Sequence, residues 1–259
     1  MPYITINNKS LFYNFINRDI LHPGKALLVF LHEGLGSSKQ WKDFHINLAN
    51  ALKLPALYYD RYGYGKSQQV EGERSVDFLE EEAEVILPEL LYSLNLNSSP
   101  LILFGHSDGG TIALLFAAKF PEKTLAVITE AAHVIVEDIT IQGQRDVIKL
   151  YKTTDLPVKL ARYHGKKTET MFWSWINVWQ SKEMLNWTIE PKLSGIKCPV
   201  LALQGSDDNY GSPEQLASIK RHSSNSNVNT VLIPGCGHVP HHQAKEEVER
   251  QTIEFINNL

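Results

Sequence analysis

The stretch "LILFGHSDGGTIAL" (residues 101–114) decides how this chain folds. An apolar run enters the turn "GHSDGG", and a second apolar run follows at once. The spacing Gly-x-Ser-x-Gly between a strand and a helix predicts a sharp turn that presents Ser107 as a nucleophile at its tip. Glycines are expected on either side because they let the backbone bend without a side-chain clash. The alternative is a glycine-rich turn that carries a bystander serine.

Short apolar runs recur along the chain on both sides of this turn, each bounded by Gly, Pro or Asn. The alternating runs 3–6 and 11–16 predict a leading hairpin. The remaining runs are almost continuously apolar, as expected for strands of a parallel sheet covered on both faces. They lie at 26–32, 55–60, 101–107, 125–131, 199–205 and 229–235. Helical spacing predicts helices at 39–52, 76–94, 109–119, 213–221 and 240–257. This alternation predicts an α/β fold with a mostly parallel sheet flanked by helices.

One stretch, 137–191, interrupts the alternation with helical spacing and no convincing strand. We expect it to form a helical cap inserted into a core built from 1–136 and 192–259. Four of the chain's five tryptophans lie here: Trp173, Trp175, Trp179 and Trp187. The first three are predicted to line a substrate pocket under the cap, and the alternative is that they pack on a core of the cap's own.

The length, charge and composition of the chain exclude several classes of function. The chain has 259 residues, a net charge of −4 and no clustered Lys and Arg, which argues against a nucleic-acid binder. No apolar run approaches the roughly 18 residues that a membrane span needs. The N-terminus lacks the basic and apolar regions of a secretory signal. Cys198 and Cys236 are expected to be buried thiols of a reducing compartment, so we expect a cytoplasmic protein.

A serine hydroxyl is a weak nucleophile at neutral pH, so it needs a base, and the base needs an orienting carboxylate. In folds with this turn the acid and then the base follow the serine along the chain. The acid candidates after late strands are Asp207, Asp208 and Glu130. The base candidates are His238, His241 and His242, of which His238 directly follows the last predicted strand. These histidines lack the Cys or carboxylate partners of a metal site, so no metal is expected.

Five segments together carry a family resemblance: "LHEGLGSS" (31–38), "DRYGYGKS" (60–67), "GHSDGG" (105–110), "LQGSDD" (203–208) and "GCGHVP" (235–240). They resemble the oxyanion loop, the D-R-x-G-x-G-x-S segment, the nucleophile turn, the acid and the base of the α/β-hydrolases. The resemblance covers nearly the whole chain and implies a triad of Ser107, Asp208 and His238. The family's G-x-x-D spacing from Gly205 favours Asp208 over Asp207.

The resemblance also implies an oxyanion hole made by the backbone N–H groups of Gly34 and Asp108. Glu33 stands where members of the family commonly have glycine, which makes it a departure from the pattern and a candidate substrate-binding residue. His32 and His106 flank these elements, and we expect both to make structural hydrogen bonds rather than to transfer protons.

Serine at the turn implies an acyl-enzyme and excludes the alkyl-enzyme chemistry of related dehalogenases and epoxide hydrolases, which carry Asp there. We expect cleavage of a carboxylic ester of a small acyl substrate without a cofactor. Thioester, amide or carbon–carbon bond hydrolysis, acyl transfer and a non-catalytic binding role remain alternatives. Asp108 resembles the residue of hydrolases similar to valacyclovir hydrolase, which implies amino-acid esters. The alternative is that its side chain bonds to neighbouring backbone.

Overall fold

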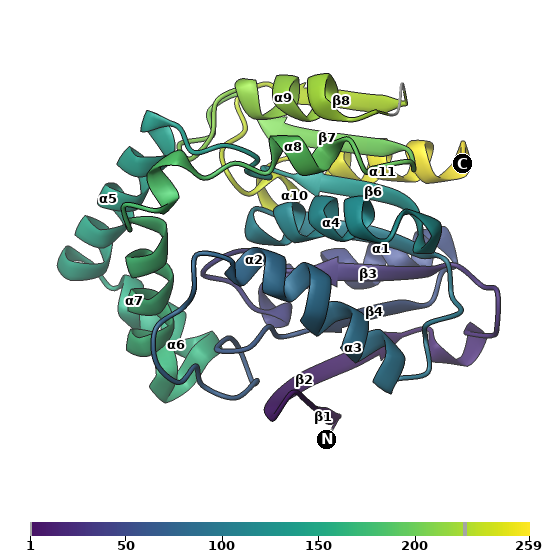
Figure 1. Cartoon of the computed structure of the whole chain (residues 1–259), viewed down its shortest axis with the longest axis horizontal. Helices are drawn as coiled ribbons and strands as arrows, with labels where there is room; N and C mark the ends of the chain where they lie inside the picture. The colour runs from purple at the N-terminus through teal and green to yellow at the C-terminus, as the bar shows by residue number, and fades with distance from the viewer. Residues whose placement is uncertain (1, 225–226) are drawn as a thin grey trace.

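The computed structural model (Figure 1) describes residues 2–224 and 227–259. Within them, eight strands form one sheet in the order β1-β2-β4-β3-β5-β6-β7-β8. The pairs β1–β2 and β2–β4 are antiparallel, and the remaining pairs are parallel. The strands are β1 Tyr3–Ile6, β2 Lys9–Ile16, β3 Leu27–Leu31, β4 Ala56–Tyr59, β5 Leu101–His106, β6 Thr124–Glu130, β7 Val200–Gly205 and β8 Val228–Ile233. The predicted α/β class with a mostly parallel sheet is confirmed.

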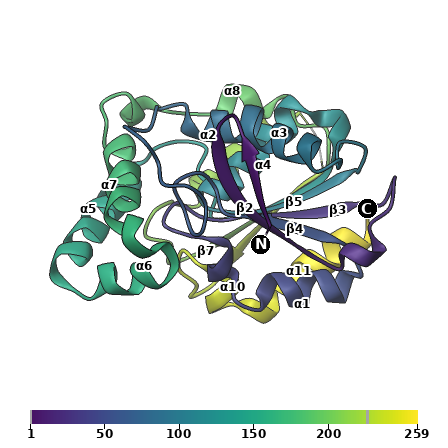
Figure 2. The ribbon, with the colours of Figure 1, turned by 90° about the horizontal axis from the view of Figure 1, so that it is seen from below.

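Helices cover both faces of the sheet (Figure 2). One face carries α1 (Phe44–Leu52), α10 (Pro240–Gln243) and α11 (Lys245–Asn257). The other carries α2 (Phe78–Glu81), α3 (Leu87–Ser93), α4 (Asp108–Lys119), α8 (Glu190–Leu193) and α9 (Glu214–His222). No helix in the described ranges is long and apolar enough to cross a membrane.

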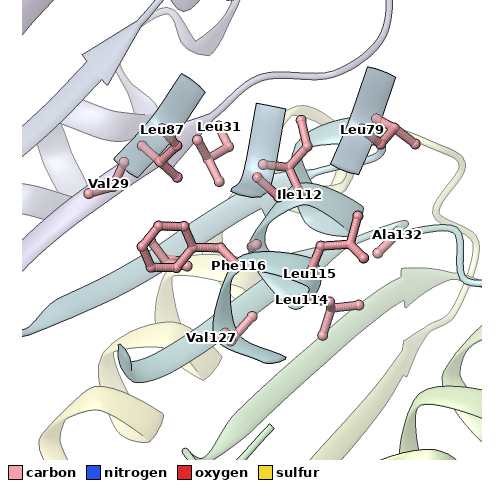
Figure 3. Packing of buried hydrophobic residues seen from close by; sticks show 14 of the residues in the cluster. Val29, Leu31, Leu79, Leu87, Ile112, Leu114, Leu115, Phe116, Val127 and Ala132 are labelled. Atoms are coloured by element: carbon pink, nitrogen blue, oxygen red, sulfur yellow. The ribbon is translucent and has the colours of Figure 1, made fainter. Parts of the chain in front are cut away.

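Strand β3 shows why the central runs are apolar without a break. Its residues are fully buried, and successive side chains point to opposite faces. Val29 packs in the layer of α4, whereas Leu28 packs in the layer of α1 with Phe44. Figure 3 shows part of the first layer, in which Val29 and Phe116 belong to one packed cluster. Both faces of the strand therefore require hydrophobic side chains.

Two predicted helices are interrupted. The segment predicted at 76–94 consists of α2, a π-helical turn at Glu82–Ile86, and α3. Pro88 has no N–H to donate to the carbonyl of Glu84, and its ring would clash with that carbonyl, so a wider turn precedes it. The segment predicted at 240–257 splits into α10 and α11 because Ala244 adopts φ −137° and ψ 44° between them.

The stretch 137–191 is largely helical and contains α5 (Asp138–Thr153), α6 (Leu156–His164) and α7 (Thr168–Trp179), and α8 begins at its end. Figures 1 and 2 both show α5, α6 and α7 grouped at one end of the sheet, outside its two helical layers. His164 ties this group to the core. Its Nδ1 accepts the N–H of Gly65 at 3.0 Å, and its Nε2 donates to the carbonyl of Leu35 at 3.1 Å. The helices are thereby held against the loops that follow β3 and β4.

Candidate active site

Ser107 lies in the turn between β5 and α4 in a backbone conformation of φ 53° and ψ −119°. Residues other than glycine rarely adopt positive φ, and such strain gathers at functional positions. The flanking glycines make the turn possible. A Cβ on Gly105 would lie 2.1 Å from the carbonyl oxygen of Gly109, and one on Gly109 would lie 2.0 Å from that of Leu31. The glycine spacing therefore permits the close approach of α4 to β3 and β5.

Three side chains from the ends of β5, β7 and β8 form one hydrogen-bonded line. The Ser107 Oγ lies 3.0 Å from Nε2 of His238, and Nδ1 of His238 lies 2.8 Å from Oδ1 of Asp208. Burial alone would raise the pKa of Asp208, but the hydrogen bond from His238 holds it below its ordinary value. An ionised carboxylate only accepts, so Nδ1 carries the proton and Nε2 can accept from the serine hydroxyl.

The other candidate acids and bases lie elsewhere. Asp207 is exposed, and its carboxylate accepts a hydrogen bond from Ser206 at 2.8 Å. The carboxylate of Glu130 lies 2.6 Å from Nδ1 of His241 in a fully buried pair. The third histidine, His242, bonds to a backbone carbonyl at 2.9 Å. Among the described residues, no group of His, Cys, Asp and Glu side chains is arranged to hold a metal ion.

Gly34 and Asp108, the residues expected to supply the oxyanion donors, both line the pocket beside Ser107. Asp108 is the first residue of α4, and the N–H groups of a first helical turn have no acceptor within the helix. The helix dipole adds positive potential at the same place. Gly34 lines the same pocket, and a Cβ there would lie 2.2 Å from Nε1 of Trp175. Glycine at this position therefore lets α7 approach the loop closely.

A pocket of about 460 Å³, part of it open to solvent, lies in front of Ser107. Its lining comprises Glu33, Gly34, Leu35, Ser107, Asp108, His133, Thr140, Gln144, Trp175, Trp179, Tyr210 and His238. Apolar and aromatic groups from α7 and the loop after β7 face a small set of polar groups, which is the composition of a ligand pocket.

Of the three tryptophans predicted to line a substrate pocket, Trp175 and Trp179 line the pocket in front of Ser107, whereas Trp173 does not. Trp175 and Trp179 are one helical turn apart and share the inner face of α7. Trp173 is two positions before Trp175 and therefore points to nearly the opposite side of the helix. Its ring packs edge-on against Tyr151 at 5.9 Å and Phe172 at 5.1 Å. The prediction is wrong for Trp173.

The Asp108 side chain bonds to Arg61 and Trp175 and not to neighbouring backbone, so the alternative predicted for it from the sequence is wrong. Its Oδ2 accepts from Nη2 of Arg61 at 3.1 Å and from Nε1 of Trp175 at 3.2 Å. Both ion-pair partners are almost completely buried. The segment "DRYGYGKS" resembles a family motif, but the resemblance gives no role to its arginine, Arg61. Because Arg61 neutralises this carboxylate, Asp108 is a weaker candidate for binding a substrate ammonium group than its sequence position suggests.

His106 makes the expected structural hydrogen bond, and it also has a charged partner. Its Nε2 donates to the carbonyl of His238 at 2.7 Å, and its Nδ1 lies 3.5 Å from Oε2 of Glu33. Burial alone would lower the pKa of His106, but the Glu33 carboxylate raises it to about 8. The same contact outweighs burial at Glu33 and holds its pKa well below the ordinary value. A pKa of about 8 favours the protonated form of His106 at neutral pH, with the Glu33 carboxylate as its charged partner.

This pair predicts a loss of stability at alkaline pH. A histidine whose pKa rises from 6.5 to about 8 on folding stabilises the fold fully below pH 6.5 and ceases to do so as the pH passes 8. The shift corresponds to about 2 kcal/mol. Between about pH 6 and about pH 9 the free energy of unfolding of the native chain should therefore fall by about 2 kcal/mol more than that of Glu33→Gln. Urea titrations at both pH values measure this difference, and equal losses contradict the assignment.

Several pocket residues carry no motif. His133 donates from Nε2 to the carbonyl of Tyr210 at 3.0 Å. Burial, together with the charge of His238, lowers the pKa of His133. The ring of Tyr210 lies 4.6 Å from that of His238, centroid to centroid. Thr140 and Gln144 are one turn apart on α5, and this spacing puts both on the pocket side. The same spacing occurs in any amphipathic helix, so it does not mark a binding site in the sequence.

Comparison with known proteins places the chain in a family. A family model described as "Alpha/beta hydrolase family" matches residues 28–251. The chain is 23% identical to 2-hydroxy-6-oxo-6-phenylhexa-2,4-dienoate hydrolase of Burkholderia cepacia, over 99% of this chain and 96% of that protein. It is 27% identical to Serine hydrolase BPHL of Homo sapiens, over 90% of this chain and 80% of that protein.

Solved structures show the same architecture. The enol-lactonase from Burkholderia xenovorans LB400 superposes with a TM-score of 0.75 at 16% identity, covering 99% of this chain and 100% of that chain. The strand order, the strained serine turn and the family match over most of the chain agree with one another. The chain belongs to the alpha/beta hydrolase family and is a hydrolase.

Proposed function

We propose that this protein is a serine hydrolase that cleaves a carboxylic ester of a small substrate through an acyl-enzyme. The observation that carries the proposal is the line Asp208–His238–Ser107, with distances of 2.8 Å and 3.0 Å, which opens into the pocket at the N-terminus of α4. His238 takes the proton of Ser107 as its oxygen attacks the acyl carbon, and Asp208 stabilises the resulting imidazolium.

The negative charge that develops on the carbonyl oxygen is stabilised by the N–H groups of Gly34 and Asp108. His238 then gives its proton to the leaving group, and the alcohol departs. In the second half a water molecule loses its proton to His238 and attacks the acyl-enzyme, which releases the acid and restores Ser107. The helices of 137–191 act as a cap over a core of 1–136 and 192–259, and Trp175 and Trp179 hold the acyl group.

The charge of the pocket favours some substrates over others. Glu33 and Asp108 contribute carboxylates to the lining, but Glu33 lies beside His106 and Asp108 is paired with Arg61, and the lining residues include no Lys or Arg. The dienoate named for the Burkholderia cepacia relative is an anion and would find no unpaired Lys or Arg among these lining residues. We therefore place ester hydrolysis of a neutral or cationic substrate ahead of carbon–carbon bond hydrolysis of an anionic one.

The Glu33 carboxylate favours a second candidate, an ester or amide of an amino acid. One oxygen of Glu33 faces His106, and the residue lines the pocket beside Ser107, so its carboxylate can accept hydrogen bonds from an ammonium group. A proline iminopeptidase of Thermoplasma volcanium is 21% identical over 98% of this chain and 95% of that protein. Glu33 replaces Asp108 as the residue that would recognise the amine, because the Asp108 side chain is 1% exposed and paired with Arg61, whereas that of Glu33 is 19% exposed.

Two substrate series test the proposal. Hydrolysis of p-nitrophenyl esters with acyl chains from two to twelve carbons, by the native chain and by Ser107→Ala, tests the serine chemistry and sizes the acyl pocket. The benzyl esters of alanine and of isobutyrate differ only by an ammonium group in place of a methyl group. We expect kcat/KM for the alanine ester to be higher by about tenfold, and Glu33→Gln to remove the preference. Equal kcat/KM values for both esters in the native chain contradict the amino-acid candidate but not the ester-hydrolase proposal.

A further inference from the structure

Arg61 is a buried charged residue that the mechanism above does not use. It follows β4, and its side chain is only 2% exposed. One nitrogen, Nη2, donates to two acceptors: the backbone carbonyl of Glu33 at 2.8 Å and Oδ2 of Asp108 at 3.1 Å. The guanidinium lies 4.6 Å from the ring centroid of Tyr64, which covers one of its faces. A single donor nitrogen thus joins the loop after β3 to the first residue of α4.

The first acceptor, the carbonyl of Glu33, belongs to the same peptide group as one of the two expected oxyanion donors. The carbonyl of Glu33 and the N–H of Gly34 belong to one peptide group, which is planar and trans. In a trans peptide the carbonyl and the N–H point in opposite directions, so holding the oxygen fixes the direction of the N–H. Arg61 therefore sets the orientation of the Gly34 N–H from the far side of the peptide.

His32 supports the same carbonyl. Its Nδ1 lies 2.8 Å from the Glu33 oxygen, and its Nε2 lies 3.0 Å from the backbone N of Arg61. Nε2 must accept from that N–H, so the proton is on Nδ1 and is donated to Glu33. Burial and the charge of Arg61 lower the pKa of His32, which keeps the ring neutral. With the backbone N–H of Gly36, which donates at 3.1 Å, the carbonyl receives three hydrogen bonds, of which only the one from Arg61 has a charged donor.

The second acceptor belongs to the residue that carries the other oxyanion donor. The Asp108 carboxylate is clamped between Arg61 and Trp175, and the backbone N–H of Asp108 begins α4. Charge-assisted bonds are roughly twice as strong as neutral ones. A carbonyl polarised by a guanidinium also makes the N–H of its own peptide a stronger donor. Arg61 therefore sets the direction of the Gly34 N–H and strengthens it as a donor. It also anchors Asp108, the residue that carries the other N–H.

We propose that Arg61 is the positioning residue of the oxyanion hole, aligning the Gly34 and Asp108 N–H groups through hydrogen bonds from one guanidinium nitrogen. The inference rests on the proposed function, since it concerns the transition state of that acyl transfer. It assigns a role to the arginine of "DRYGYGKS" that lies in neither the triad nor the pocket lining.

The test compares three variants with the native chain on the best p-nitrophenyl ester. Arg61→Met alone would leave the Asp108 charge buried without a partner, so the test variant is Arg61→Met/Asp108→Asn, which removes both charges. Asp108→Asn alone keeps the Arg61 bond to the Glu33 carbonyl. Arg74→Met is the matched control, because Arg74 stacks on the same Tyr64 ring at 4.7 Å but bonds to Ser174 and to the Tyr62 carbonyl instead.

Losing a whole oxyanion donor costs about 10²–10³ in kcat, so misaligning one should cost the double variant about 10–100-fold in kcat with KM within about threefold. Asp108→Asn should lose about threefold or less, and Arg74→Met should match the native chain. A boronic acid that forms a tetrahedral adduct with Ser107 should lose affinity by the same factor as kcat. The carboxylic acid product should bind unchanged, which separates transition-state alignment from general loosening of the site.

The inference is overturned if the double variant keeps the native kcat, or if boronic acid and product lose affinity equally. If the double variant does not fold, Arg61→Lys decides. It keeps the charge but not the planar fork, and we expect a loss of about tenfold in kcat, whereas an unchanged kcat overturns the inference. Labelling of the native chain by a fluorophosphonate is measured first. If the fluorophosphonate does not label Ser107 and the native chain hydrolyses no ester, the proposed function fails and the inference fails with it.

Discussion

Ser107→Ala is expected to reduce kcat on p-nitrophenyl esters by about 10⁶-fold, because it removes the only atom that forms the acyl-enzyme. The fold should survive, since the methyl group of alanine fits where Cβ of Ser107 already lies. KM should change little, because the pocket and the oxyanion donors remain. Initial rates over a range of ester concentrations, with thermal unfolding of the same preparation, measure both quantities.

Ser107→Gly provides the matched control for backbone strain. We expect Ser107→Gly to be as inactive as Ser107→Ala, but glycine relieves the strain of the positive φ of 53° at this residue. We therefore expect Ser107→Gly to be more stable than Ser107→Ala by about 1 kcal/mol, the relief of strain less the added freedom of the unfolded glycine. Substantial ester hydrolysis by either variant would show that the nucleophile is another residue.

Asp208→Asn is expected to lower kcat by about 10⁴-fold. The amide can donate to Nδ1 of His238, which would place the imidazole proton on Nε2, where it cannot accept from Ser107. The carboxylate also stabilises the imidazolium that forms when His238 takes the serine proton, and a neutral amide does not. The shape of the side chain is preserved, so the loss reports on proton placement and charge rather than on packing. Steady-state kinetics on the ester series measure it.

Asp207→Asn is the control that the chain itself offers. The two residues are adjacent, but the Asp207 carboxylate is turned outward to Ser206. We expect Asp207→Asn to keep native kcat and stability. The assignment of the acid is contradicted if the two variants exchange these results, or if both retain activity.

The sequence determined the architecture and the place of Ser107 in a strand–helix turn because these depend on local pattern. Continuously apolar runs separated by helical segments require a sheet covered on both faces. Gly105 and Gly109 bracket the one serine that a strand–helix turn can present, and the close contacts at both glycines explain why no other residue fits there. The predicted strands and the order serine, acid, base follow from these short-range features.

The family's G-x-x-D spacing already favoured Asp208 over Asp207, and the tertiary structure supplies the physical reason: the loop after β7 turns Asp208 to His238 and Asp207 to Ser206. Trp173 and Trp175 needed the tertiary structure, because they differ by the face of α7 on which they lie.

The structure alone also paired residues that are far apart in the chain. Arg61 meets Asp108 across 47 positions, and Glu33, in the loop after β3, meets His106, the last residue of β5. Neither pair leaves a periodic or motif signal, because each residue's role depends on the partner that folding brings to it. The sequence by itself therefore determined a hydrolase fold with a serine at its turn, whereas the tertiary structure decided which charges surround that serine, because burial and distance set their protonation and their direction.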